Sequence, residues 1–142
     1  MKEELVFEIT HKELGLLREF STVLRGEHDA IISFSLEGIV AENNHKEEIL
    51  KKLEYLKREK DTLLTGDIDP ETTVGGKTWR SLCTEMNHTI KDVRNGIDRN
   101  MKLLSFSVDH VKSSIENIVG LLNRTSYGKK KERISMVLSR SV

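Results

Sequence analysis

The fold is decided by residues 79–122, which read WRSLCTEMNHTIKDVRNGIDRNMKLLSFSVDHVKSSIENIVGLL. Apolar residues recur there every three or four positions, which is typical of the apolar stripe of one amphipathic helix. The stripe consists of Trp79, Leu82, Met86, Ile90, Val93, Ile97, Met101, Leu104, Val108, Val111, Ile115, Ile118 and Leu122. A helix over residues 78–124 would be about 70 Å long, and we expect it to need an apolar partner along its whole stripe.

The front half of the chain carries a second apolar series on helical spacing. The segment Thr10–Glu13 has the form of a capping box preceded by the apolar Ile9, which predicts a helix start near Thr10. Ser35 has the side chain of an N-cap, yet the apolar spacing continues through it without a proline. The pattern favours one long helix over residues 10–65 and leaves open two helices, in line or as a hairpin.

Residues 66–77 contain most of the turn formers of the chain, including its single proline, and predict the reversal between the two stripes. Asp69–Glu71 also has the pattern of a cap and first turn of a short helix. Residues 125–142 form a basic tail with apolar residues on one helical face. We therefore expect a single all-α domain over residues 1–142, a long antiparallel helical hairpin or up-down bundle, coiled-coil-like, with a short C-terminal helical or flexible tail.

The amino-acid composition excludes several classes of protein function. The 142 residues include 23 basic and 23 acidic side chains, so the formal net charge is zero and no general attraction to nucleic acid or anionic membranes follows. The apolar runs are too short to cross a bilayer, and the acidic start of the chain lacks a signal-peptide core. The lone Cys83 agrees with a reducing compartment. We expect a cytoplasmic protein with no stable membrane insertion.

The residues that carry catalytic or metal chemistry are not arranged for it. Three Glu-x-x-His pairs have the spacing of helical carboxylate metal centres, but the helical wheel turns them away from the apolar stripes. These pairs are Glu8 with His11, Glu42 with His45, and Glu85 with His88. Gly75–Thr78 lacks the spacing of a phosphate-binding loop, and Lys129–Lys131 has no aromatic residues among its lysines. The sequence thus predicts no enzyme, no cofactor, no metal and no nucleic-acid partner.

Apolar residues outside the main stripe indicate an interaction surface. Leu103, Phe106 and Leu121 lie off the core direction of the long helix. They form a strip that suits an incoming amphipathic helix. The alternative is that the same chain covers the strip, either with Phe7 and Ile9 or with tail residues. The tail residues in question are Ile134, Val137 and Leu138.

Two segments of the front half carry motifs of a known protein family. Glu27–Ile32 (EHDAII) has the form of an acidic-x-x-Ala-Leu segment, and Lys46–Leu53 (KEEILKKL) has the form of a Lys-x-x-Leu-Leu-x-x-Leu run. Both segments resemble those of the FlgN-type flagellar export chaperones. The resemblance covers most of the chain and extends to Arg58, Leu63-Leu64, Asn95, Asn100, Leu103-Leu104, Ser105, Val108 and Tyr127-Gly128. The sequence departs from the family pattern at Lys129–Lys131, where a small and acidic stretch is expected, and in its compact linker.

The resemblance implies a cytosolic, non-enzymatic chaperone that binds the terminal helices of FlgK- and FlgL-like hook-filament junction proteins. Such a chaperone prevents premature assembly and delivers its clients to the membrane export gate. The residues expected to contact the client are Leu103, Phe106, Leu121, Ile134, Val137 and Leu138. Tyr127 is expected to dock the client or the gate. A structural coiled-coil adaptor that self-associates through the same strip is the alternative.

Overall fold

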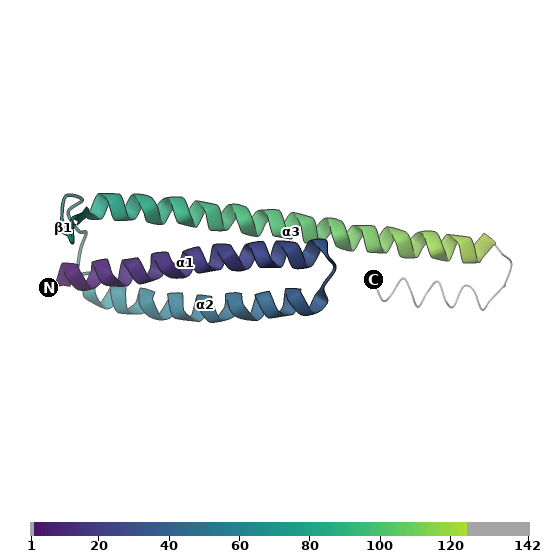
Figure 1. The fold of residues 1–142 in the computed structure, drawn as a ribbon, viewed down its shortest axis with the longest axis horizontal. Helices are drawn as coiled ribbons and strands as arrows, with labels where there is room; N and C mark the ends of the chain where they lie inside the picture. Colours follow the sequence, from purple (N-terminus) through teal and green to yellow (C-terminus); the bar gives the residue numbers. More distant parts are fainter. Residues whose placement is uncertain (1, 125–142) are drawn as a thin grey trace. The chain divides into compact units, whose positions relative to one another are not determined.

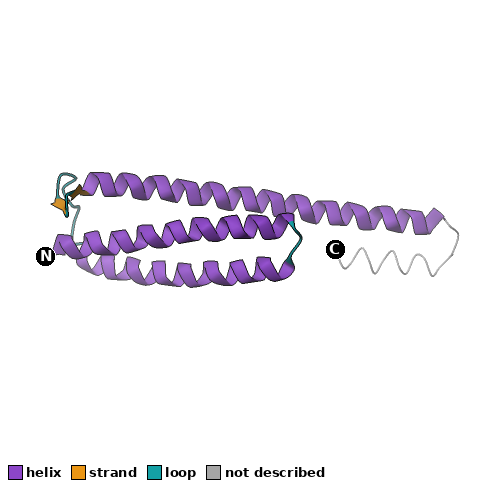
Figure 2. Cartoon of the chain, in the orientation of Figure 1, coloured by secondary structure: helices purple, strands orange, loops and turns teal. Residues whose placement is uncertain are grey.

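The computed structural model describes residues 2–124 and divides the chain into two compact units, Met1–Asn100 and Met101–Val142. The described residues form three helices and a two-stranded sheet (Figure 1). The helices are α1 (Lys2–Ile32), α2 (Leu36–Leu63) and α3 (Trp79–Arg124), and the strands are β1 (Thr73–Val74) and β2 (Lys77–Thr78). Helices account for nearly all of this structure (Figure 2), and the predicted all-α fold class is confirmed.

The front half is a hairpin of two helices, so the interpretation as one long helix is wrong. The amide of Ser35 donates to the Ala30 carbonyl (2.9 Å) and the amide of Phe34 donates to the Ile31 carbonyl (3.1 Å). Phe34 has a φ of 54°, and this left-handed residue with its two hydrogen bonds is a Schellman ending of α1. Ser35 then caps α2, because its Oγ accepts a hydrogen bond from the amide of Gly38.

Two further helix boundaries differ from the patterns in the sequence. Helix α1 extends back to Lys2, through the residues before Thr10 for which the sequence leaves this extension open, and the buried Thr10 hydroxyl donates to the Val6 carbonyl at 2.8 Å. The expected short helix at Asp69–Glu71 is a turn, in which the Glu71 amide donates to Asp69 Oδ1 at 2.9 Å. At both places the side chain that was expected to cap a helix, Thr10 or Asp69, forms a hydrogen bond with a nearby backbone group instead.

The linker ends in a β-hairpin that starts α3. Strands β1 and β2 pair antiparallel across Gly75 and Gly76, whose φ values of 60° and 78° suit a two-residue type I′ turn. The Thr78 hydroxyl accepts a hydrogen bond from the Ser81 amide at 3.1 Å and so caps the first turn of α3. The hairpin thereby fixes where the long helix begins.

The core of the unit Met1–Asn100 consists of two apolar clusters. One contains Phe7, Leu14 and Leu82, with Trp79 beside Phe7 at 5.3 Å between ring centroids. The other joins all three helices and comprises Phe20, Val23, Leu24, Ile49 and Val93. These clusters hold the antiparallel pair α1 and α2, visible in Figure 1, against the first part of α3.

Buried polar side chains within this unit are paired. Glu13 accepts from Lys60 and Glu27 accepts from Lys46, each at 2.5 Å, which links α1 to α2. Asn100 is 4% exposed and donates through Nδ2 to the Leu24 carbonyl (2.8 Å) and to Glu27 Oε1 (3.0 Å). These bonds fix the register of the helices, because buried polar groups are costly unless they are satisfied.

None of the helices in the described part of the chain has an apolar stretch of the length that a bilayer crossing requires.

Candidate functional site

The structure describes three of the seven residues predicted for the site, all on α3 in the unit Met101–Val142. Phe106 is 70% exposed, Leu121 is 61% exposed, and Leu103 is half-buried. Tyr127, Ile134, Val137 and Leu138 lie outside the described residues. The described part of the predicted strip is therefore largely exposed to solvent.

Most of the main stripe of α3 in this unit is also exposed, which corrects the expectation that the front half provides a partner along its whole length. Met101 is 65% exposed and Val108 is 52% exposed, whereas Val93 is 8% exposed. The physical reason is length, because the front half forms helices of about 46 and 42 Å instead of one of about 75 Å. Among the described residues of this unit the exposed large apolar ones are Met101, Leu104, Val108, Val111 and Ile118 on the main stripe, and Phe106 and Leu121 outside it; together they are here named the α3 apolar face.

The α3 apolar face has few polar features of its own. The rings of Phe106 and His110 stack with centroids 6.5 Å apart and an interplanar angle of 10°. The hydroxyls of Ser107 and Ser114 donate to the carbonyls of Leu103 and His110, one turn earlier in the helix. The hydroxyls of these serines already donate hydrogen bonds within α3. The α3 apolar face therefore offers a partner apolar surface and few free hydrogen-bond donors.

Phe7 and Ile9 do not cover this face as the sequence analysis had allowed. Phe7 is 1% exposed and packs with Leu14 and Leu82 in the core of the first unit. Ile9 is 7% exposed on the same helix. Both apolar side chains are thus already used inside the unit Met1–Asn100.

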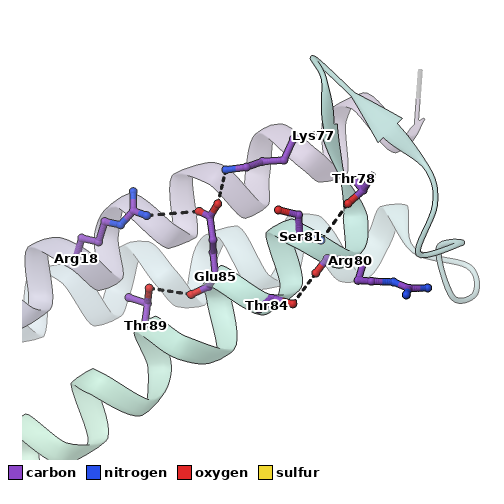
Figure 3. A network of polar contacts seen from close by, with 8 residues as sticks. All are labelled: Arg18, Lys77, Thr78, Arg80, Ser81, Thr84, Glu85 and Thr89. Carbon is purple, nitrogen blue, oxygen red and sulfur yellow. Dashed lines mark hydrogen bonds and ion pairs between the residues drawn. The ribbon is translucent and has the colours of Figure 1, made fainter.

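The carboxylates near the start of α3 are held in ion pairs (Figure 3). Glu85 lies 2.6 Å from Lys77 Nζ and 3.5 Å from Arg18 Nη2, and thereby links β2, α1 and α3. The hydrogen bond from Lys77, supported by the charges of Lys77, Arg18 and His11, lowers the pKa of Glu85. These ion pairs join the first turns of α3 to β2 and α1, so their role is structural.

Two histidines of the Glu-x-x-His pairs also have local partners. His45 Nε2 lies 3.0 Å from Glu19 Oε1, and His88 Nε2 lies 3.6 Å from Asp92 Oδ2. Among residues 2–124 no group of three or more His, Cys, Asp or Glu side chains is placed to hold a metal ion. Burial raises the pKa of the Cys83 thiol, and Lys60 partly opposes that shift. A raised pKa disfavours the nucleophilic thiolate.

Sequence reasoning missed two surface features. Phe34, Leu36 and Val40 are all more than half exposed around the turn between α1 and α2. An apolar groove also lies between these helices, with Gly15 in its lining. The isolated glycine in the middle of a helical pattern was the available signal for the groove.

Most of the chain is similar to a known protein family. A family model described as FlgN protein matches residues 1–133, which is most of the chain. No curated protein and no solved structure gives a match. The family model covers all three helices, the linker hairpin and the α3 apolar face, and on this evidence the chain belongs to the FlgN family.

Proposed function

We propose that this protein is a cytosolic flagellar type III export chaperone that binds the terminal helices of FlgK- and FlgL-like hook-filament junction proteins. Membership of the FlgN family supports a flagellar export chaperone-type role. The chaperone keeps its clients from assembling early and delivers them to the export gate. It does so by binding alone, without enzymatic chemistry.

The observation that carries this proposal is the exposure of the α3 apolar face. A large apolar side chain that goes from solvent to full burial contributes about 1.5–3 kcal/mol. Several such side chains on one helix provide enough apolar area to seat an amphipathic helix. Contiguous exposed apolar surface is typical of interaction sites in proteins that are otherwise well packed.

In this mechanism the client helix lays its own apolar side against α3. Leu103, Phe106 and Leu121 contact the client, together with the tail residues Ile134, Val137 and Leu138. The client's assembly surface is then shielded until it reaches the gate. Tyr127 serves as the docking anchor for the gate or the client.

Binding of synthetic terminal segments of FlgK- and FlgL-like proteins tests the proposal by calorimetry. We expect Phe106→Asp to weaken binding by about tenfold or more, because a charged group enters an apolar interface. Leu36→Asp is the matched control, since Leu36 is 73% exposed on α2 and outside the α3 apolar face. Equal binding by Phe106→Asp and wild type, at unchanged helicity, would refute the proposed surface.

The tail is tested separately. Ile134→Asp combined with Leu138→Asp is expected to abolish client binding while far-UV circular dichroism stays unchanged. A global loss of helicity would instead assign these residues to the core. Tyr127→Ala is expected to reduce export while the protein remains folded, and unchanged export would remove Tyr127 from the docking site.

The same exposed face favours a second candidate, a coiled-coil adaptor that self-associates. In that case the α3 apolar face of one copy covers that of another. Light scattering on the free protein separates the two candidates. The chaperone is expected to be predominantly monomeric, whereas the adaptor forms a stable oligomer that Phe106→Asp dissociates.

A further inference from the structure

An open apolar groove lies on the unit Met1–Asn100, formed by α1 and α2 alone. Its volume is about 570 Å³, within the range of about 300–1,000 Å³ that is common for binding pockets. It is lined by Lys12, Gly15, Leu16, Glu19, Lys51, Lys52, Tyr55 and Leu56. None of these residues belongs to α3, so the packing of the long helix leaves the groove accessible.

The lining of the groove includes an exposed glycine that close packing does not require. A Cβ atom built on Gly26, Gly38 or Gly96 would lie 2.9–3.0 Å from a neighbouring side chain, so close packing accounts for these three glycines. A Cβ atom on Gly15 meets nothing within 4 Å. Glycine in a helix interior costs stability relative to alanine. Packing against the described residues therefore does not account for Gly15, and the same holds for Gly120 on α3.

The side walls of the groove are apolar. Leu16 is half-buried, Leu56 is 8% exposed, and Tyr55 is 62% exposed with its ring available to a ligand. The lining positions on α1 are spaced by three or four residues, so they form one continuous helical face. Two adjacent helices with an apolar groove between them are a suitable seat for a third helix.

The charges at the rim favour an acidic partner. Lys51 and Lys52 are exposed, and neither has a carboxylate within ion-pair distance among the residues that the structure describes. Lys12 is paired only with the exposed Glu8, at 3.5 Å. The one acidic lining residue, Glu19, is engaged by His45 at 3.0 Å. Cationic groups around an apolar groove complement a helix that carries carboxylates beside its apolar residues.

We propose that the groove between α1 and α2 is a second docking site, which binds an acidic amphipathic helix of a partner protein. An apolar side chain of that helix enters the space over Gly15, and its carboxylates meet Lys51 and Lys52. The site shares no residue with the α3 apolar face, so the two surfaces can be changed independently.

The test uses the full chain and a fluorescein-labelled synthetic helix with a leucine stripe flanked by glutamates, measured by fluorescence anisotropy. Gly15→Leu adds a side chain to the groove lining at a position where a Cβ atom meets nothing within 4 Å, and it is expected to weaken binding by about tenfold or more with no loss of thermal stability. Tyr55→Ala removes an exposed wall of the groove and should weaken binding in the same direction. A probe with lysines in place of the glutamates should bind weakly or not at all.

Charge reversal provides a matched pair of variants. Lys51→Glu with Lys52→Glu is expected to weaken binding strongly, whereas Lys57→Glu with Arg58→Glu, adjacent residues of α2 that do not line the groove, should have little effect. Salt should weaken binding to wild type, since going from about 0.1 M to about 1 M shortens the Debye length from about 10 Å to about 3 Å.

Three results would overturn the proposal. The first is undiminished binding of the acidic helix to Gly15→Leu. The second is equal binding of the glutamate and lysine probes. The third is loss of binding in Phe106→Asp but not in Gly15→Leu, which would place the probe on the α3 apolar face. Loss of client binding in Phe106→Asp is measured with client segments, so the two proposals can fail independently.

Discussion

Phe34 provides a direct test of how the front half folds. It is a bulky aromatic residue in the left-handed region, with a φ of 54°, at the end of α1. This conformation costs an L-residue about 1–2 kcal/mol, whereas glycine adopts it freely. Glycine loses about 0.5–1 kcal/mol more backbone entropy on folding. Phe34→Gly is therefore expected to stabilise the protein by about 0.5–1 kcal/mol.

The side chain itself contributes little that would oppose this gain, because Phe34 is 66% exposed. Thermal unfolding followed by circular dichroism should show a rise in Tm of about 2–4 °C for Phe34→Gly. Phe34→Ala keeps the left-handed strain and loses the remaining side-chain contacts. It should be slightly less stable than wild type, by less than about 1 kcal/mol.

A comparison of alanine and glycine at two positions isolates the backbone effect. At position 34 glycine should be more stable than alanine by about 1 kcal/mol. At the exposed helical position Ala41 the same exchange, Ala41→Gly, should be destabilising by about 1 kcal/mol. If glycine is the less stable residue at both positions, the chain does not reverse at Phe34 through a left-handed residue, and the hairpin assignment fails.

Three further predictions concern packing and charge. Leu82 is 0% exposed, so Leu82→Ala should lower the unfolding free energy in urea by about 2–5 kcal/mol, whereas Leu104→Ala, at a 42% exposed position, should lower it by less than about 1 kcal/mol. Lys46→Met removes the partner of the nearly buried Glu27 and should cost about 1–3 kcal/mol, and an unchanged urea midpoint would mean that the pair does not form. Lys77 lowers the pKa of Glu85 in the folded state. The ionised Glu85 carboxylate therefore stabilises the fold at a pH above its unfolded-state pKa, and this stabilisation is lost as the pH falls through its folded-state pKa. The stability difference between wild type and Glu85→Gln should therefore shrink on acidification, and a constant difference from neutral pH to acid would contradict the ion pair.

The helical content was predictable because apolar spacing is a local property of the sequence. The stripe from Trp79 onward predicts α3, and the cluster of glycines and the proline predicts the reversal before it. The break at residues 33–35 was harder to predict. Its left-handed residue is Phe34 instead of glycine, and the apolar spacing stays in phase across it. The N-cap at Ser35 was the only local sign, and a continuous stripe outweighed it.

The candidate site was predictable in a different sense. A helical wheel gives the direction in which Phe106 and Leu103 point, but it does not tell which part of a stripe finds a partner. That depends on the length of the neighbouring helices, and therefore on the break that the pattern did not favour. The same limit applies to the groove, since its lining combines residues of α1 and α2 and exists only once the two helices are packed together.

The boundary between Asn100 and Met101 divides α3 into a part that stabilises the fold and a part that is exposed for binding. Asn100 is 4% exposed and bonds to Glu27 and to the backbone of α1, whereas Met101, the next residue, is 65% exposed. Apolar residues before this point stabilise the fold through burial, while the exposed ones after it contribute little to folding. Leu82 and Leu104 belong to one sequence stripe, so their alanine variants compare these two roles directly. A large stability loss confined to Leu82→Ala would mean that the later part of the stripe is available for a partner, as a chaperone requires.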